Sequence, residues 1–254
     1  GKKTLLIQGD SRTKILNDDE SIQAMKDIEF IKKFNIVSAG ASSYSLSPML
    51  VQLEVLKKDF DISPNIIVAL MDPTDIGDEV CRYKPLLQYE DGRLKSLIRE
   101  PNNGNIYWLD YTILGSKINL HKGLKIKYLP DLITYIVRDR IFQKKKTCGW
   151  GEIQKPLIKK NKESNKYYKS LMADYINEAF RSKELEKMYI VSYPHVQHYS
   201  EKVYGNKYIT KISDIVNEVL LESKHKNKIT HIDFYKDNIF PEMGENFFEY
   251  FQEG

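Results

Sequence analysis

Short runs of apolar residues alternate with longer amphipathic stretches along much of the chain. Five of the short runs are rich in Ile, Leu and Val and end at glycine, proline or polar residues, as is typical of strands. They cover residues 4–8, 35–38, 65–70, 188–192 and 229–234. The third run, with the sequence NIIVAL, is almost wholly apolar and predicts a central strand that is covered on both faces.

The amphipathic stretches between these runs predict helices over residues 19–33, 47–58, 165–186 and 212–222. Pro48 suits the first turn of the second helix. Strands that alternate with helices form a parallel sheet with right-handed crossovers. We therefore predict an α/β fold.

The middle of the chain, residues 77–151, is less regular and contains many aromatic residues and turn formers. We interpret it as an insertion after the third strand. It forms either a lid or substrate wall, because long connections often carry function, or a packed structural excursion. Since there is no internal repeat or low-complexity linker, we predict a single domain over residues 1–254.

Composition narrows the class of partner. The chain has 254 residues, of which 41% are hydrophobic, and a net charge of +4. That charge is too mild to indicate nucleic acid, and no nucleic-acid motif is present. Lysines at 144–146 and at 159, 160 and 162 fit a solvated surface or attraction to an anionic substrate, glycan or membrane surface. No apolar run approaches the roughly 20 residues of a transmembrane helix, so no transmembrane segment is predicted.

The two cysteines bear on the compartment. Cys81 and Cys148 do not make a disulfide framework and lack metal-ligand spacing. They fit a cytosolic chain, or one bridge in an exported protein. Because no signal peptide is present, we expect a cytoplasmic protein; an exported or cell-surface form would require that an N-terminal segment has been removed.

Three predicted strands end in clusters of small or acidic residues: residues 9–11 (GDS), 40–42 (GAS) and 72–75 (DPTD). In open α/β sheets the ligand lies at the carboxyl ends of the strands, so we expect these clusters to face one crevice. Gly9 permits a sharp turn that leaves Ser11 exposed near backbone N–H groups able to hold an oxyanion. The alternative is that Asp10 or Ser11 only caps a helix.

The order of these clusters resembles that of the SGNH/GDSL hydrolase superfamily. Residues 5–11 (LLIQGDS) are similar to its first block, and residues 37–42 (VSAGAS) to its second. The resemblance implies Ser11 as nucleophile, Gly40 as an oxyanion-hole donor, and a three-layer α/β/α, flavodoxin-like fold with a parallel five-stranded sheet. It covers residues 4–75 and rests beyond them on the alternation of strands and helices.

The third block departs from the family pattern G-x-N-D. Thr74 stands where the asparagine should be, and Asp75 matches the aspartate. A threonine hydroxyl or N–H can still donate to an oxyanion, although loss of one such donor typically lowers the rate about 100-fold or more. Asp72, Asp75, Asp78 and Glu79 can bind a metal, but we predict a solvated turn, and no metal or cofactor.

The family's last block, D-x-x-H, supplies the general base and the acid that orients it. No Asp-x-x-His follows the fourth predicted strand, and we expect the given sequence to end before that block. His195 and His198 follow the fourth strand on the correct side of the sheet. They are candidates for substrate contact or structural hydrogen bonding, for the missing base, or for a metal pair, and we predict that they bind substrate.

These features together predict a serine esterase that forms an acyl-enzyme on Ser11. The expected substrate is a small acyl ester, such as an O-acetyl group on a carbohydrate, since Tyr107, Trp108 and Tyr111 suit stacking on sugars. The alternatives are an O-acyltransferase that uses the same site and a non-catalytic glycan-binding module. A nucleotide or phosphate binder is a further alternative.

Overall fold

The computed structural model describes residues 2–14, 16, 18–97, 148, 153, 162–194, 211–234 and 236. The described strands form a five-stranded parallel sheet in the order β2-β1-β3-β6-β7, and a separate antiparallel hairpin, β4-β5. The sheet strands are β1 (Lys3–Gln8), β2 (Phe34–Ser38), β3 (Ile66–Met71), β6 (Lys187–Ser192) and β7 (Ile229–Asp233). The hairpin strands are β4 (Leu87–Glu90) and β5 (Arg93–Leu97).

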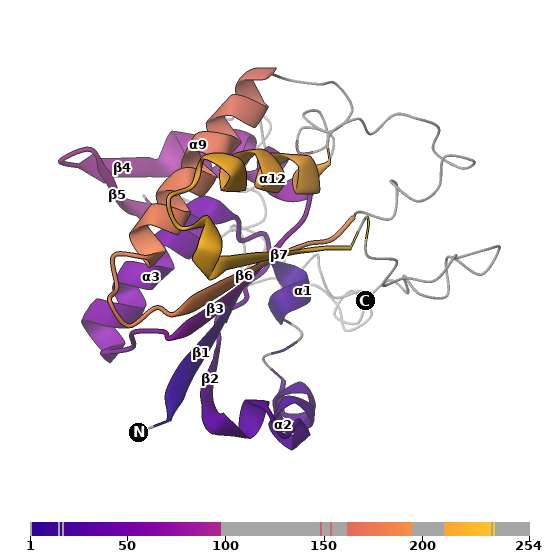
Figure 1. The fold of residues 1–254 in the computed structure, drawn as a ribbon. Helices are drawn as coiled ribbons and strands as arrows, with labels where there is room; N and C mark the ends of the chain where they lie inside the picture. The colour runs from indigo at the N-terminus through magenta and orange to yellow at the C-terminus, as the bar shows by residue number, and fades with distance from the viewer. Residues whose placement is uncertain are drawn as a thin grey trace, which may run out of the picture. The chain divides into compact units, whose positions relative to one another are not determined.

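Helices cover both faces of the sheet, which makes a three-layer α/β arrangement (Figure 1). One face carries α3 (Leu46–Phe60), α9 (Lys162–Ala179) and α12 (Ile212–Glu222), and α9 packs against both of the others. The short α1 (Ser11–Lys14) and α2 (Asp19–Asp27) lie on the other side of the sheet. The remaining helical segments are η2 (Ile31–Lys33), α4 (Thr74–Gly77), η3 (Asp78–Tyr83), η4 (Lys84–Leu86) and η8 (Lys226–Lys228).

The main core fills the space between the sheet and α3, α9 and α12. Its largest fully buried side chains include Leu6 of β1, Ile67 of β3 and Tyr168 of α9. A buried polar contact crosses this core: the Tyr175 hydroxyl of α9 donates to Gln8 Oε1 at 2.8 Å. The Gln8 amide donates in turn to the Met49 carbonyl at 3.0 Å. Because buried polar groups need partners, this contact fixes where β1, α3 and α9 meet.

The structure confirms all five strands predicted for the sheet, and β3 lies at its centre as expected. The helix predicted over residues 19–33 ends early, at Asp27, because Ile28 adopts an extended backbone conformation. Ile28 and Phe30 are 52% and 61% exposed, so the apolar pattern there does not reflect burial. The helix predicted over residues 165–186 ends at Ala179, after which the chain turns towards β6.

The segment that we interpret as an insertion begins as regular structure. Residues 77–97 complete α4 and form η3, η4 and the hairpin. The chain divides into two compact units, one of residues 1–97 with 148–254 and one of residues 98–147. The second unit lies outside the described residues, as do Tyr107, Trp108 and Tyr111, so the lid or substrate wall and the single domain remain predictions.

Cys81 and Cys148 form a disulfide with a Cα–Cα distance of 5.7 Å. The sequence left open whether these cysteines pair. Shortly after Cys148, the buried Ile153 lies against Gly77: a Cβ built on Gly77 would come within 2.0 Å of the Ile153 carbonyl oxygen. The chain at Cys148 and Ile153 is therefore held against η3 and α4. No helix among the described residues has the length and apolar character needed to span a membrane.

Candidate active site

Ser11 lies at the carboxyl end of β1, directly after a turn that requires glycine. Gly9 has φ +157°, and a Cβ at this position would lie 2.2 Å from Thr13 Oγ1 and 3.0 Å from the Leu70 carbonyl oxygen. Ser11 is the first residue of α1 and is exposed. The turn therefore presents a hydroxyl at the edge of the sheet where ligands of α/β proteins bind.

Asp10 holds this turn in place. Its Oδ1 accepts hydrogen bonds from the Arg12 N–H at 3.0 Å and from the Tyr193 hydroxyl at 2.9 Å. Its carbonyl accepts from the Lys14 N–H at 3.0 Å. Asp10 is thus the capping residue of α1, and Ser11 is left with its side chain towards solvent.

Gly40 lies against α1, the helix that begins with Ser11. A Cβ on Gly40 would lie 2.5 Å from the main-chain carbon of Thr13 and 2.6 Å from the nitrogen of Lys14. The Ala41 N–H also donates to the Gly9 carbonyl at 3.2 Å. The structure therefore brings the first and second sequence clusters together at one edge of the sheet.

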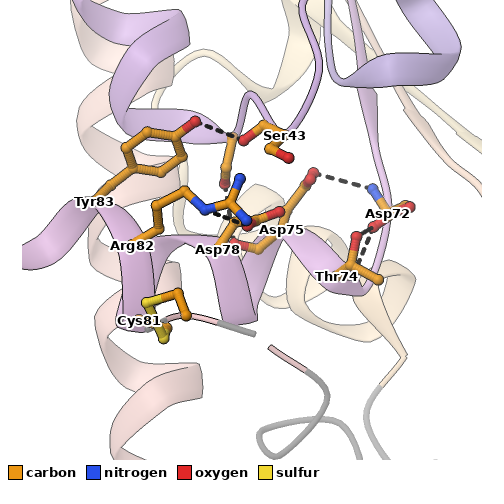
Figure 2. A network of polar contacts seen from close by, with 10 residues as sticks. Ser43, Asp72, Thr74, Asp75, Asp78, Cys81, Arg82 and Tyr83 are labelled. Atoms are coloured by element: carbon orange, nitrogen blue, oxygen red, sulfur yellow. Dashed lines mark hydrogen bonds and ion pairs between the residues drawn. A yellow bond between two sulfur atoms is a disulfide. The ribbon is translucent and has the colours of Figure 1, made fainter. Parts of the chain in front are cut away.

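Residues 72–75, the third cluster, form hydrogen bonds mainly with one another. Asp72 Oδ1 accepts from the Thr74 N–H at 2.6 Å and from the Thr74 hydroxyl at 2.5 Å, and the Asp72 N–H donates to Asp75 Oδ2 at 3.1 Å (Figure 2). Both donors of Thr74, a predicted oxyanion donor, are therefore occupied. Asp75 is 1% exposed and has one carboxylate oxygen, Oδ1, without a hydrogen bond in the described part of the chain.

The prediction that these acids form a solvated turn is wrong. Exposed fractions are low for all four: Asp72 3%, Asp75 1%, Asp78 5% and Glu79 0%. The sequence could not show the burial of Glu79, because the donors that accommodate it come from α3, elsewhere in the fold. Ser47 of α3 donates its N–H and its hydroxyl to Glu79, at 2.6 and 2.7 Å, and Arg82 forms an ion pair with Asp78 at 3.4 Å.

Burial raises the pKa values of this group. Burial, and to a smaller extent the charge of Asp72, raises the pKa of Asp10 to about 6. The pKa of Asp72 is raised by burial, against hydrogen bonds from Thr74, and that of Asp75 is raised well above its usual value by burial and by its acidic neighbours. Ligand atoms of Asp10, Asp72 and Asp75 lie within 4.8 Å of one another, so these carboxylates are the described residues that could hold a cation.

Two site residues were missed by the sequence analysis. The Arg12 guanidinium lies over the Tyr193 ring, 4.7 Å from its centroid. Tyr193 directly follows β6, so it lies at the same edge of the sheet as Ser11. The rule that ligands bind at the carboxyl ends of parallel strands could have indicated both residues.

The histidines predicted to bind substrate, His195 and His198, lie outside the described residues. Two other histidines are described. The ring of His231 is within hydrogen-bonding distance of Ser192 Oγ at 2.7 Å and Asn217 Oδ1 at 2.8 Å. His225 stacks on Phe180 with ring centroids 4.5 Å apart.

A cavity of about 310 Å³ lies between α3, α9 and the β4-β5 hairpin. Leu50, Leu94 and Leu171 line it, with Asp174 and Arg93 among its polar groups. It includes none of the predicted site residues.

Comparison of the sequence with models of known protein families gives no match, and comparison with curated proteins finds none that matches.

Proposed function

We propose that the chain is a serine ester hydrolase of the SGNH/GDSL type, with Ser11 as nucleophile. The observation that carries this proposal is the exposed Ser11 at the carboxyl end of β1, on a turn that only glycine fits and in the helix α1 against which Gly40 lies. The strand order β2-β1-β3-β6-β7 supports a flavodoxin-like arrangement, in which β2 is added on one side of β1 and β3 on the other, so that the strand order reverses at β1 and β3. Ligands bind at such a reversal, and Ser11 lies there.

The reaction transfers an acyl group in two steps. A histidine outside the described residues, with His195 and His198 as candidates, accepts the proton of Ser11 while its Oγ bonds to the ester carbonyl carbon. The resemblance implies Gly40 as the oxyanion-hole donor, and Gly40 lies against the helix that begins with Ser11. The bond to the alcohol oxygen then breaks, and the alcohol takes the proton from the histidine. Water attacks the acyl-enzyme by the same route and releases the acid and Ser11.

The substrate that we propose is a small acyl ester, such as an O-acetyl group on a carbohydrate. The exposure of Ser11 fits an acyl group carried by a larger molecule, because the nucleophile is approached from solvent. If a sugar hydroxyl replaces water in the second step, the same site is an O-acyltransferase.

One observation favours a second candidate, a non-catalytic glycan-binding module. Asp72 takes both donors of Thr74, so the third block offers no donor from that side chain to an oxyanion. Loss of one oxyanion donor slows acyl transfer by about 100-fold or more. A module that has lost catalysis would retain the fold and this altered third block.

Hydrolysis of p-nitrophenyl acetate by the full chain separates the two candidates. We expect Ser11→Ala to lower kcat/KM by at least about 1000-fold, because the covalent step is lost. The hairpin variant Ser96→Ala is the matched control and should retain the rate. A fluorophosphonate probe should label the unaltered chain at Ser11 and leave Ser11→Ala unlabelled. Equal rates for the unaltered chain and Ser11→Ala would exclude the esterase.

The disulfide bears on the compartment. Disulfides persist in oxidising compartments and are rare in the cytosol. The Cys81–Cys148 bridge therefore favours an exported or cell-surface protein over the cytoplasmic location expected from the sequence.

A further inference from the structure

Arg12, the residue after the proposed nucleophile, is a cation with no carboxylate within ion-pair distance among the described residues. Arg12 is partly buried, and its guanidinium forms no hydrogen bond or ion pair with any residue in the part of the chain that the structure describes. The guanidinium carbon lies over the Tyr193 ring, 4.7 Å from the ring centroid. A guanidinium stacked on a ring keeps its N–H donors at the edge of its plane available to another group.

A single carboxylate positions both parts of this stack. Asp10 Oδ1 accepts from the Arg12 main-chain N–H and from the Tyr193 hydroxyl, at 3.0 and 2.9 Å. The backbone of Arg12 and the ring beneath its side chain are therefore fixed to one buried atom. A cation held in this way is already ordered before a ligand arrives, which lowers the entropic cost of binding.

Arg12 also acts on the buried acids: its charge partly opposes the rise that burial causes in the pKa values of Asp10 and Asp72. That effect does not occupy the guanidinium, because no described carboxylate lies within ion-pair distance of it.

We propose that Arg12, stacked on Tyr193, binds an anionic group of the substrate beside the ester that Ser11 attacks. A guanidinium pairs in a bidentate manner with carboxylate and with phosphate. The substrate class is therefore an O-acylated acidic sugar, either a uronic acid or a sugar phosphate. The net charge of +4 favours the approach of such a molecule. This inference rests on the proposed function and adds the charge of the substrate to it.

Three probes test the proposal on the full chain: mono-O-acetylated methyl glucoside, the corresponding glucuronide, and the corresponding 6-phosphate. We expect kcat/KM for at least one acidic probe to exceed that for the neutral probe by about tenfold or more, as is typical of hydrogen bonds to charged groups. In Arg12→Gln this ratio should fall towards one, mainly through a higher KM for the acidic probe. Which acidic probe is preferred distinguishes carboxylate from phosphate.

The matched control is Lys14→Gln. It removes an exposed cation from the same helix and leaves Arg12 stacked on the Tyr193 ring. It should leave the acidic-to-neutral ratio unchanged. Tyr193→Leu removes the ring and should lower the ratio, whereas Tyr193→Phe keeps the ring and should retain most of it. Thermal melting of each variant shows that it is folded.

Binding of the same probes to Ser11→Ala by calorimetry makes this test independent of catalysis. Tighter binding of an acidic probe, lost in Ser11→Ala/Arg12→Gln, would support the inference even if the chain hydrolyses nothing. Three outcomes would overturn it: equal affinity for acidic and neutral probes, no binding of any probe, or equal loss of the ratio in Lys14→Gln and Arg12→Gln. If hydrolysis requires Ser11 but is equally fast for acidic and neutral probes, the proposed esterase function holds and the inference about Arg12 is overturned.

Discussion

Glu79 is an acid held inside the fold by donors from another helix. Its carboxylate accepts the N–H and hydroxyl of Ser47, and burial raises the pKa of Glu79 to about 7 against those hydrogen bonds. The folded chain thus binds this proton more tightly than the unfolded chain, where the pKa is near its usual value of 4.5. The stabilising contribution is complete below about pH 4.5 and is lost as the pH rises through about 7.

Glu79→Gln should therefore weaken the pH dependence of stability. We expect the unfolding free energy of the unaltered chain to fall between pH 5 and pH 8, with about 2–3 kcal/mol of the fall due to Glu79. The fall should be smaller in Glu79→Gln, and Glu184→Gln, at an exposed acid, should behave as the unaltered chain does. Urea denaturation at both pH values measures this. The same fall in all three proteins would mean that Glu79 titrates normally.

Gly40→Ala should displace the proposed nucleophile. The added Cβ would meet main-chain atoms of Thr13 and Lys14 at 2.5 and 2.6 Å, so α1 must shift, at a cost of about 1–3 kcal/mol. Esterase activity per folded molecule should drop at least about tenfold, since small misplacement of a nucleophile is costly.

Gly92→Ala provides the contrast. Gly92 has φ +75° and open space around it, so alanine there costs about 1 kcal/mol through backbone strain alone. Its activity should be unchanged once stability is corrected for. Equal activity of Gly40→Ala and Gly92→Ala would separate Gly40 from the site.

At the scale of elements, α3 ends on a residue poorly suited to its conformation. Asp61, the C-cap, has φ 54° and ψ 35°, a left-handed conformation that glycine adopts without strain. Asp61→Gly should raise the unfolding free energy by about 0.5–1 kcal/mol. Asp59→Gly, two residues earlier within the helix, should lower it by about the same amount. Chemical denaturation compares the two, and destabilisation by both would show that the strain at Asp61 is relieved by some other contact.

The accuracy of the sequence-based predictions also differs from element to element. All five sheet strands were located because apolar runs between turn formers depend only on local composition. The helix predicted over residues 19–33 was too long, because the spacing of apolar residues in the sequence cannot show that Ile28 and Phe30 remain exposed. The clusters of small residues at the ends of the predicted strands indicated Ser11 and Gly40 as candidate site residues. The contact of Tyr193 with Asp10 joins residues 183 positions apart, and it depends on tertiary packing that no local pattern contains.

At the scale of the whole molecule, the Cys81–Cys148 bridge closes a loop across a sequence separation of 67 residues. Reduction should lower the unfolding free energy by about 2–4 kcal/mol, mainly because the unfolded chain gains freedom. Urea denaturation with and without dithiothreitol measures this. The double variant Cys81→Ser/Cys148→Ser should match the reduced chain and not respond to reductant. Two alkylatable thiols in the native, unreduced protein would show that the bridge is absent.

The bridge also bears on how much the length of the chain between Leu97 and Cys148 can vary. Cys148 and Ile153 anchor the returning chain against η3 and Gly77, whatever the length of sequence between Leu97 and Cys148. Closing a longer loop costs only slightly more entropy than closing a shorter one. We therefore expect insertions or deletions between Leu97 and Cys148 to leave the parallel sheet intact.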